Sequence, residues 1–245
     1  MNSLGLSVRL WALLVAAAVC APIGCTRPPA APLRAPYPTL RSLVVLPLSN
    51  QSPSGDVDGV VAADILAAEL AQVDGLVVLP TNRALKLLLV RGKTHATSLA
   101  EALDVAGELG ADGVVMGAVT EYKPYKPQKL GMILQLHWLR ADRPMDATDP
   151  VSYSRRPRGS DEGFYGGRPP ASQAQALFDG RRNDVTGQIH RYARDREGMD
   201  SPLGWRRYLT DSDAFMHFVC HEMIIRLLDA ELQRITTPVG VAQLR

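Results

Sequence analysis

Apolar residues along this chain form two kinds of pattern, short β-rich runs and longer stretches with helical spacing. The short runs predict buried strands at residues 42–49, 76–80 and 113–120. The stretches with helical spacing cover residues 57–74, 82–91 and 98–109. Residues 130–139 carry an apolar residue at every second position, which predicts a half-buried antiparallel strand. The resulting order, β-α-β-α-α-β-β, predicts an α/β fold with a mixed sheet in two or three layers, flanked by helices.

The ends of these helices carry residues that favour helix termini. Gly75, Gly92 and Gly110 follow the three helices, at the place where a left-handed glycine commonly ends a helix. Ser98 and Glu101 have the spacing of a capping box at the start of the third helix. The boundaries of the elements are therefore marked independently of their apolar spacing.

The second half of the chain changes character. Residues 140–201 are rich in Arg, Asp, Gly and Pro and contain only short apolar pieces, so we expect a long, polar, partly disordered insertion there. Within it, residues 184–197 have helical spacing and predict an exposed or partner-docking helix.

A strongly amphipathic helix is predicted after the insertion, over residues 211–232, with Asp211 or Ser212 as its cap. Its wide apolar face includes Phe218 and Leu227. We expect this helix to close the domain, so that residues 42–139 and 202–236 pack together and the insertion loops out between them. Residues 237–245 are expected to form a tail.

The first 24 residues are typical of an export signal. Arg9 precedes the apolar run Leu10–Ala21, which as a helix spans about 18 Å and is too short for a hydrocarbon core of about 30 Å. Pro22-Ile23-Gly24-Cys25 then resembles a bacterial lipobox, in which small residues precede a cysteine that becomes the lipidated first residue of the mature chain. Pro22 departs from the usual leucine, and Cys20 is the competing position. An ordinary secretory peptide with an incidental Cys25 is the alternative.

Lipidation at Cys25 would hold the protein on a membrane almost permanently, since each buried CH₂ contributes about 0.8 kcal/mol. Thr26 follows the cysteine, where an aspartate would resemble an inner-membrane retention signal. We therefore expect the outer membrane, with the domain facing the periplasm. Residues 25–41 are rich in proline and contain no acid, which predicts an extended tether with a reach of roughly 50 Å. A Pro-rich ligand for a partner domain is the alternative.

Composition narrows the classes of function. The net charge of +2 argues against a strong polyanion binder, so no nucleic acid is expected. A hydrophobic fraction of 46% against 21% charged residues is sufficient for a packed core. Three cysteines are too few for a disulfide scaffold.

Several segments of the predicted domain match the pattern of a known family. The segments VVLPLSN, LVVLPTNR and LAEALDVAGELGADGVVMGAVTEY resemble the CsgG-like and TolB-amino-terminal-like envelope domains. The resemblance covers about residues 42–139, and its most specific positions are Gly110-Ala111-Asp112 and Gly117. It implies a periplasmic lipoprotein or module that binds or assembles proteins, not an enzyme. The curli-secretion channel also needs two transmembrane hairpins, for which no free pair of long alternating segments is present, so the pore function is not carried over.

Catalytic motifs are absent from the sequence, which contains no phosphate-binding loop, G-x-S-x-G elbow, HExxH or CxxC, and no cofactor is expected. One constellation remains, because Asp213, His217 and His221 lie on one stripe of the last helix. Two imidazoles and a carboxylate are a workable zinc or transition-metal set. A solvated polar face explains the same residues, and we predict that they bind no metal. Cys220 lies among apolar residues and is predicted to be a buried free thiol.

Together these features predict a non-enzymatic lipoprotein, anchored in the outer membrane through Cys25. Its domain would bind or scaffold envelope proteins or cell-wall machinery. A homo-oligomer, and in particular an oligomeric export component related to the curli channel, is one alternative. A metal-dependent hydrolase built on Asp213, His217 and His221 is another.

Overall fold

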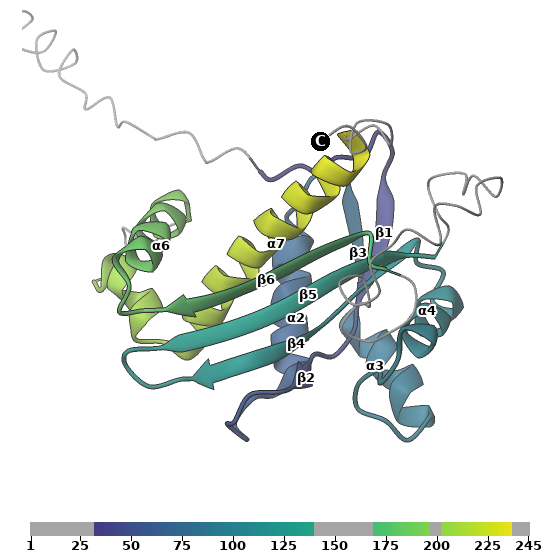
Figure 1. Ribbon diagram of the computed structural model, residues 1–245, viewed down its shortest axis with the longest axis horizontal. Helices are drawn as coiled ribbons and strands as arrows, with labels where there is room; N and C mark the ends of the chain where they lie inside the picture. Colours follow the sequence, from purple (N-terminus) through teal and green to yellow (C-terminus); the bar gives the residue numbers. More distant parts are fainter. Residues whose placement is uncertain (1–31, 140–168, 197–201, 237–245) are drawn as a thin grey trace, which may run out of the picture. The chain divides into compact units, whose positions relative to one another are not determined.

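One mixed sheet organises the domain in the computed structural model, which describes residues 32–139, 169–196 and 202–236 (Figure 1). The strand order is β3-β1-β4-β5-β6. β1 (Arg41–Val45) pairs in parallel with β3 (Leu76–Leu79) on one side and β4 (Gly113–Lys123) on the other. β5 (Lys129–Trp138) and β6 (Ser172–Asp179) extend the sheet in antiparallel fashion. The two-residue β2 (Ser49–Asn50) pairs in parallel with β4.

Helices pack on both faces of this sheet, which confirms the predicted α/β class. The larger core cluster joins the sheet to α2 (Gly59–Leu70), α6 (Asn183–Asp195) and α7 (Ser212–Thr236). A smaller cluster on the other face joins it to α3 (Thr81–Val90) and α4 (Leu99–Glu108). A short 3₁₀ helix, η1 (Gly204–Leu209), leads into α7. Phe218 and Leu227 of α7 are buried, as their spacing predicted.

The specific positions of the family resemblance have structural roles. Gly110 adopts a positive φ of 71° after α4, where a glycine is favoured. A side chain at Gly117 would place its Cβ 2.3 Å from the backbone oxygen of Ile133 on β5, so only glycine fits. Asp112 Oδ2 accepts hydrogen bonds of 2.8 Å from both the backbone N–H and the hydroxyl of Ser42. These residues therefore fix the turn into β4 and its alignment with β1.

The prediction of a polar insertion that loops out of the domain is wrong for the part of residues 140–201 that the structure describes. Residues 172–179 form β6, which pairs with β5 over its full length, and Phe178 is buried against Phe218 of α7 with ring centroids 5.6 Å apart. The helix predicted at 184–197 is present as α6, but Val185 and Ile189 are buried in the main core. This segment therefore belongs to the domain. Residues 140–168 lie outside the described part.

The predicted tether is also wrong for residues 33–41. Ala35 is buried, and its N–H donates to the backbone oxygen of Asp74 over 2.9 Å. Tyr37 packs edge-on against Trp138, with ring centroids 5.1 Å apart. A proline-rich segment without acidic residues favours an extended linker, yet the same extended backbone can add to the domain edge once apolar partners are available. The predicted lipidation site and residues 26–31 lie outside the described part.

The C-terminal half of α7 is held by a buried carboxylate, that of Glu231. Glu231 accepts the indole N–H of Trp138 over 3.0 Å, and Arg234 forms an ion pair with it at 2.6 Å. Because Trp138 also contacts Tyr37, the end of α7, the end of β5 and the N-terminal segment are joined at one place.

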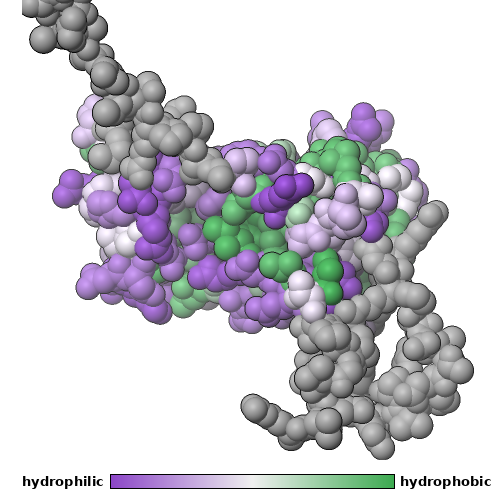
Figure 2. Space-filling view, turned by 90° about the horizontal axis from the view of Figure 1, so that it is seen from above, coloured by the Kyte–Doolittle hydropathy of each residue, from purple (hydrophilic) through white to green (hydrophobic). Residues whose placement is uncertain are grey.

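Apolar residues gather in the middle of the face shown in Figure 2, with polar residues around them. Large apolar side chains that remain exposed in the described residues include Leu40, Val77, Leu232 and Ile235. In the same ranges, no helix combines the length and the apolar character needed to cross a bilayer.

Candidate functional site

The three residues of the predicted stripe on α7, Asp213, His217 and His221, do not lie in one environment. His217 and His221 lie beside Glu69 of α2, whereas Asp213 is exposed in the first turn of α7. The backbone N–H of Asp213 donates to Asp211 Oδ1 over 3.0 Å, so Asp211 is the cap of this helix. The expectation of a fully solvated polar face is therefore wrong at His217 and His221, because that face of the helix packs on α2.

Glu69 is the buried centre of a polar cluster, which we call the Glu69 cluster: Glu69, Tyr192, Arg196, His217 and His221. Only 2% of Glu69 is exposed. Arg196 donates from Nη1 to Glu69 Oε1 over 2.9 Å, and its Nη2 lies 2.7 Å from Oε2 as an ion pair. His217 Nδ1 lies 2.8 Å from Oε1, a contact that requires the proton on Nδ1. A buried carboxylate is stabilised by partners of this kind.

Three helices meet at the Glu69 cluster. Tyr192 and Arg196 come from α6 and its end, the histidines come from α7, and Glu69 comes from α2. The Tyr192 hydroxyl donates to Glu69 Oε1 over 3.3 Å, and the Arg196 guanidinium lies 4.7 Å from the centre of the Tyr192 ring. The cluster therefore ties α6 and α7 to α2 by charge as well as by apolar packing.

Burial shifts the pKa values of His221, Tyr192 and the adjacent Cys220. It lowers the pKa of His221, and the Arg196 guanidinium lowers that pKa further. Arg196 Nη2 lies 3.3 Å from His221 Nδ1, which fits a neutral imidazole that accepts at this nitrogen. Burial likewise raises the pKa of the Tyr192 phenol and of the Cys220 thiol, and the Glu69 charge acts in the same direction on both.

Stability is expected to depend on pH through His221. Its pKa is lowered in the folded chain, so below the ordinary histidine pKa of about 6.5 the unfolded chain takes up a proton that the folded chain resists. The stabilisation is present above about pH 6.5 and is lost as the pH falls, by at most about 1.4 kcal/mol per pH unit. Urea unfolding at pH 5.5 and 8 measures this difference, which should shrink in His221→Phe. An identical pH dependence in the two proteins would contradict the assignment.

The Glu69 cluster does not have the character of a metal site. Arg196 neutralises the carboxylate that would have to serve as a ligand, and Asp213 is exposed in the first turn of α7. Across residues 32–139, 169–196 and 202–236, no group of three or more His, Cys, Asp or Glu side chains is placed to hold a metal ion. Cys220 is buried and free, in agreement with its apolar neighbours in the sequence.

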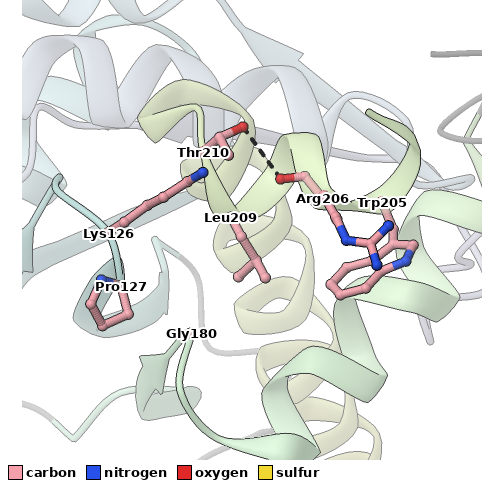
Figure 3. A pocket seen from close by; sticks show the side chains of 7 residues that line it. All are labelled: Lys126, Pro127, Gly180, Trp205, Arg206, Leu209 and Thr210. Atoms are coloured by element: carbon pink, nitrogen blue, oxygen red, sulfur yellow. Dashed lines mark hydrogen bonds between the residues drawn. The ribbon is translucent and has the colours of Figure 1, made fainter. Parts of the chain in front are cut away.

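A pocket on the surface lies between η1 and the turn that joins β4 to β5. We call it the Trp205 pocket, and its lining residues are Lys126, Pro127, Gly180, Trp205, Arg206, Leu209 and Thr210 (Figure 3). Its volume is about 350 Å³, within the range that holds small ligands. The Arg206 guanidinium lies 5.0 Å from the centre of the Trp205 ring, and the His190 ring lies 4.0 Å from it. The pocket therefore combines an aromatic and apolar wall with two cationic side chains.

A second hollow, of about 560 Å³, lies where the link from β1 to β2 meets the start of α2. Asp58 lines it, but its carboxylate already caps α2 by accepting the N–H groups of Val60 and Val61. His95 also lines this hollow and lies 3.3 Å from the Thr94 hydroxyl. The polar groups here serve local structure.

Sequence reasoning missed Glu69, Arg196 and the Trp205 pocket. Glu69 had a detectable signal, since it stands between Leu66 and Val73 on the apolar stripe of the helix predicted at 57–74. A charged residue at such a position is buried and needs a partner. The residues of the Trp205 pocket come from three separate segments and share no spacing, so the fold alone brings them together.

No family model and no curated protein matches this chain. Solved structures do match it. The lipoprotein GNA1162 from Neisseria meningitidis is 17% identical over 57% of this chain and 80% of its own, with a TM-score of 0.36. The LpoB C-terminal domain from Salmonella enterica is 14% identical over 43% of this chain and 77% of its own, with a TM-score of 0.35. The hypothetical protein CT253 from Chlamydia trachomatis is 11% identical over 80% and 95%, with a TM-score of 0.35.

Proposed function

We propose that this chain is a non-enzymatic lipoprotein, anchored through Cys25 in the outer membrane, whose α/β domain faces the periplasm and binds envelope partners. The observation that carries the proposal is the apolar run Leu10–Ala21, which is followed by Pro22-Ile23-Gly24-Cys25 shortly before the first residues packed on the domain. A lipid at Cys25 would leave the entire domain outside the bilayer.

The segment between Cys25 and the first residue held by the domain is shorter than the tether predicted from the sequence. Leu33 already accepts a hydrogen bond of 2.8 Å from the N–H of Asp74, so the chain is held by the domain from this residue onward. Eight residue steps separate Cys25 from Leu33, and at 3.3–3.6 Å per residue they span at most about 29 Å. The domain would therefore act close to the membrane surface, and its partners would have to present themselves there.

Binding, in preference to catalysis, is favoured by the chemistry of the described surface. The Trp205 pocket offers apolar contact and positive charge, which recognise a ligand without changing it. Within the Glu69 cluster, Arg196 forms an ion pair with Glu69, His217 forms a hydrogen bond with it, and Glu69 itself is buried. The cluster is therefore suited to hold the helices that frame the domain.

The anchor is tested by replacing Cys25 with serine. We expect Cys25→Ser to be lost from the outer-membrane fraction, because no thiol remains to carry the acyl chains. The loss is expected whether the altered chain becomes soluble or persists as a precursor of larger mass. Cys20→Ser is the matched control and should remain in the outer membrane. Fractionation on a density gradient after a high-salt wash measures both proteins. Recovery of Cys25→Ser with the outer membrane would contradict the proposal.

A further inference from the structure

The Trp205 pocket presents positive charge beside an apolar wall. Lys126 and Arg206 are exposed at its rim, while Pro127, Leu209 and Trp205 are partly buried and supply the wall. In Figure 3, Lys126 extends toward Thr210, and the guanidinium of Arg206 lies along Trp205. The two cations stand at different parts of the same rim, and both side chains are long and exposed, so they can converge on one anionic group.

Neither cation is neutralised within the part of the chain that the structure describes. No carboxylate there forms an ion pair with Lys126 or Arg206, and the neighbouring acids are engaged elsewhere. Asp179 Oδ1 accepts the backbone N–H of Arg181 over 2.9 Å, and Asp211 caps α7 and lies 3.8 Å from Arg207. The pocket is thus suited to an anionic group, and its apolar wall favours a ligand that carries an apolar group beside that anion.

An amide with no hydrogen-bond partner among the described residues lies behind the pocket. Gln128 follows Pro127, and its backbone oxygen accepts the N–H of Gly180, another lining residue, over 2.9 Å. Strand alternation puts its side chain on the face of the sheet that bears Leu130. Leu209 covers this face, since a Cβ at Gly180 would lie 3.1 Å from Leu209 Cδ2. Gln128 is 1% exposed, and both polar atoms of its side chain lack a partner.

A buried amide without a partner costs free energy, so a ligand that supplies one is favoured. The amide of Gln128 can donate and accept at once, which complements the C=O and N–H of a peptide unit. Gln128 does not line the pocket, so binding at this amide requires the Leu209 side chain to move aside. A simple anion such as phosphate has no apolar group to contact the wall, and a fatty acid has no amide to form hydrogen bonds with Gln128.

We propose that the Trp205 pocket binds the carboxylate end of a peptide. Lys126 and Arg206 hold the carboxylate, the wall formed by Pro127, Trp205 and Leu209 takes the last apolar side chain, and Gln128 bonds the preceding amide. This inference rests on the proposed function, because it names the chemistry by which an envelope partner is recognised. A protein C-terminus and a cell-wall stem peptide both offer this chemistry.

Calorimetry with the full-length chain in detergent tests the pocket. One probe is an acetylated hexapeptide that ends in Ala-Leu with a free carboxylate, and its C-terminal carboxamide is the charge control. A stem pentapeptide that ends in D-Ala-D-Ala is the second carboxylate probe. We expect the carboxamide to bind at least about 10-fold more weakly than its carboxylate, because a charge-assisted hydrogen bond is lost. Preference for the first or the second carboxylate assigns the source to a protein or to the cell wall.

Matched variants localise the binding. Lys126→Ala and Arg206→Ala are each expected to lower the affinity for the carboxylate probe about 10-fold. Lys123→Ala and Arg207→Ala remove neighbouring cations that do not line the pocket and should leave affinity unchanged. Gln128→Met is expected to weaken binding while the chain remains folded, since it removes the amide and nearly keeps the shape. Equal affinity for carboxylate and carboxamide, no binding of either carboxylate, or equal losses in the control variants would each overturn the proposal.

The assay separates this inference from the proposed function. The peptide titration does not depend on the anchor, and the fractionation of Cys25→Ser does not depend on the pocket. A chain that leaves the outer membrane in Cys25→Ser but binds neither carboxylate refutes the pocket alone. A chain that binds the carboxylate but stays in the outer membrane in Cys25→Ser refutes the anchor alone.

Discussion

Arg196→Ala is expected to lower the free energy of unfolding by about 3 kcal/mol, because Glu69 would remain buried without its main cation. Arg194→Ala is the matched control on the same helix. Arg194 is about half exposed and forms a surface ion pair with its exposed neighbour Asp195, so its loss should cost less than about 0.5 kcal/mol. Urea unfolding at pH 8, where His221 is neutral, measures both proteins.

The double variant Glu69→Leu/Arg196→Met separates a buried-charge effect from a general loss of packing. It removes the carboxylate together with its cation, so it should recover most of the stability lost in Arg196→Ala. His217 would then face an apolar side chain and can turn toward solvent, since 41% of its side chain is exposed. If the double variant is less stable than Arg196→Ala, burial of an unpaired charge is not the reason for the loss.

Replacing residues 140–201 by a short linker is expected to abolish folding. The replacement removes β6, which covers the edge of β5, and α6, which carries Tyr192 and Arg196 to Glu69. A domain of this size has only about 5–15 kcal/mol of stability to lose. Circular dichroism and thermal unfolding measure the outcome. A cooperative transition near that of the intact chain would mean that this segment lies outside the core.

Two single variants on β6 give the same information without a deletion. Phe178 is 2% exposed and Leu177 is 49% exposed, because adjacent side chains point to opposite faces of the strand. Phe178→Ala should therefore cost about 3–5 kcal/mol, whereas Leu177→Ala should cost less than about 0.5 kcal/mol. Comparable losses in the two variants would contradict the observed register.

Apolar spacing was sufficient to predict most of the sheet and its helices, and it failed where the apolar residues are small. β4 and β5 were found because valine, leucine and methionine dominate their buried positions. In β6 the inward positions are Ser172, Ala174, Ala176 and Phe178, of which the first three are polar or small and only Phe178 is strongly apolar. Their burial comes from α7, which packs on this face of the strand with Phe218 against Phe178. The strand that pairs with β6, β5, lies 36 to 50 residues away in the sequence, so neither contact leaves a local trace.

The polar sites show a similar division. The spacing of His217 and His221 correctly placed both on one side of α7, but the group that they face, Glu69, lies on another helix far away in the sequence. Only its presence inside an apolar stripe marked it in advance. The Trp205 pocket had no mark at all, because Lys126, Gly180 and Trp205 meet only after β5, β6 and η1 have packed.

Mass spectrometry of the mature N-terminus tests the central claim most directly. In the protein purified from the outer membrane, we expect Cys25 as the first residue, with its thiol bearing a diacylglyceryl group and its amine an acyl chain. Cys20→Ser should give the same modified N-terminus. A mature chain that begins at another residue, or that retains an unmodified thiol at Cys25, would contradict the account.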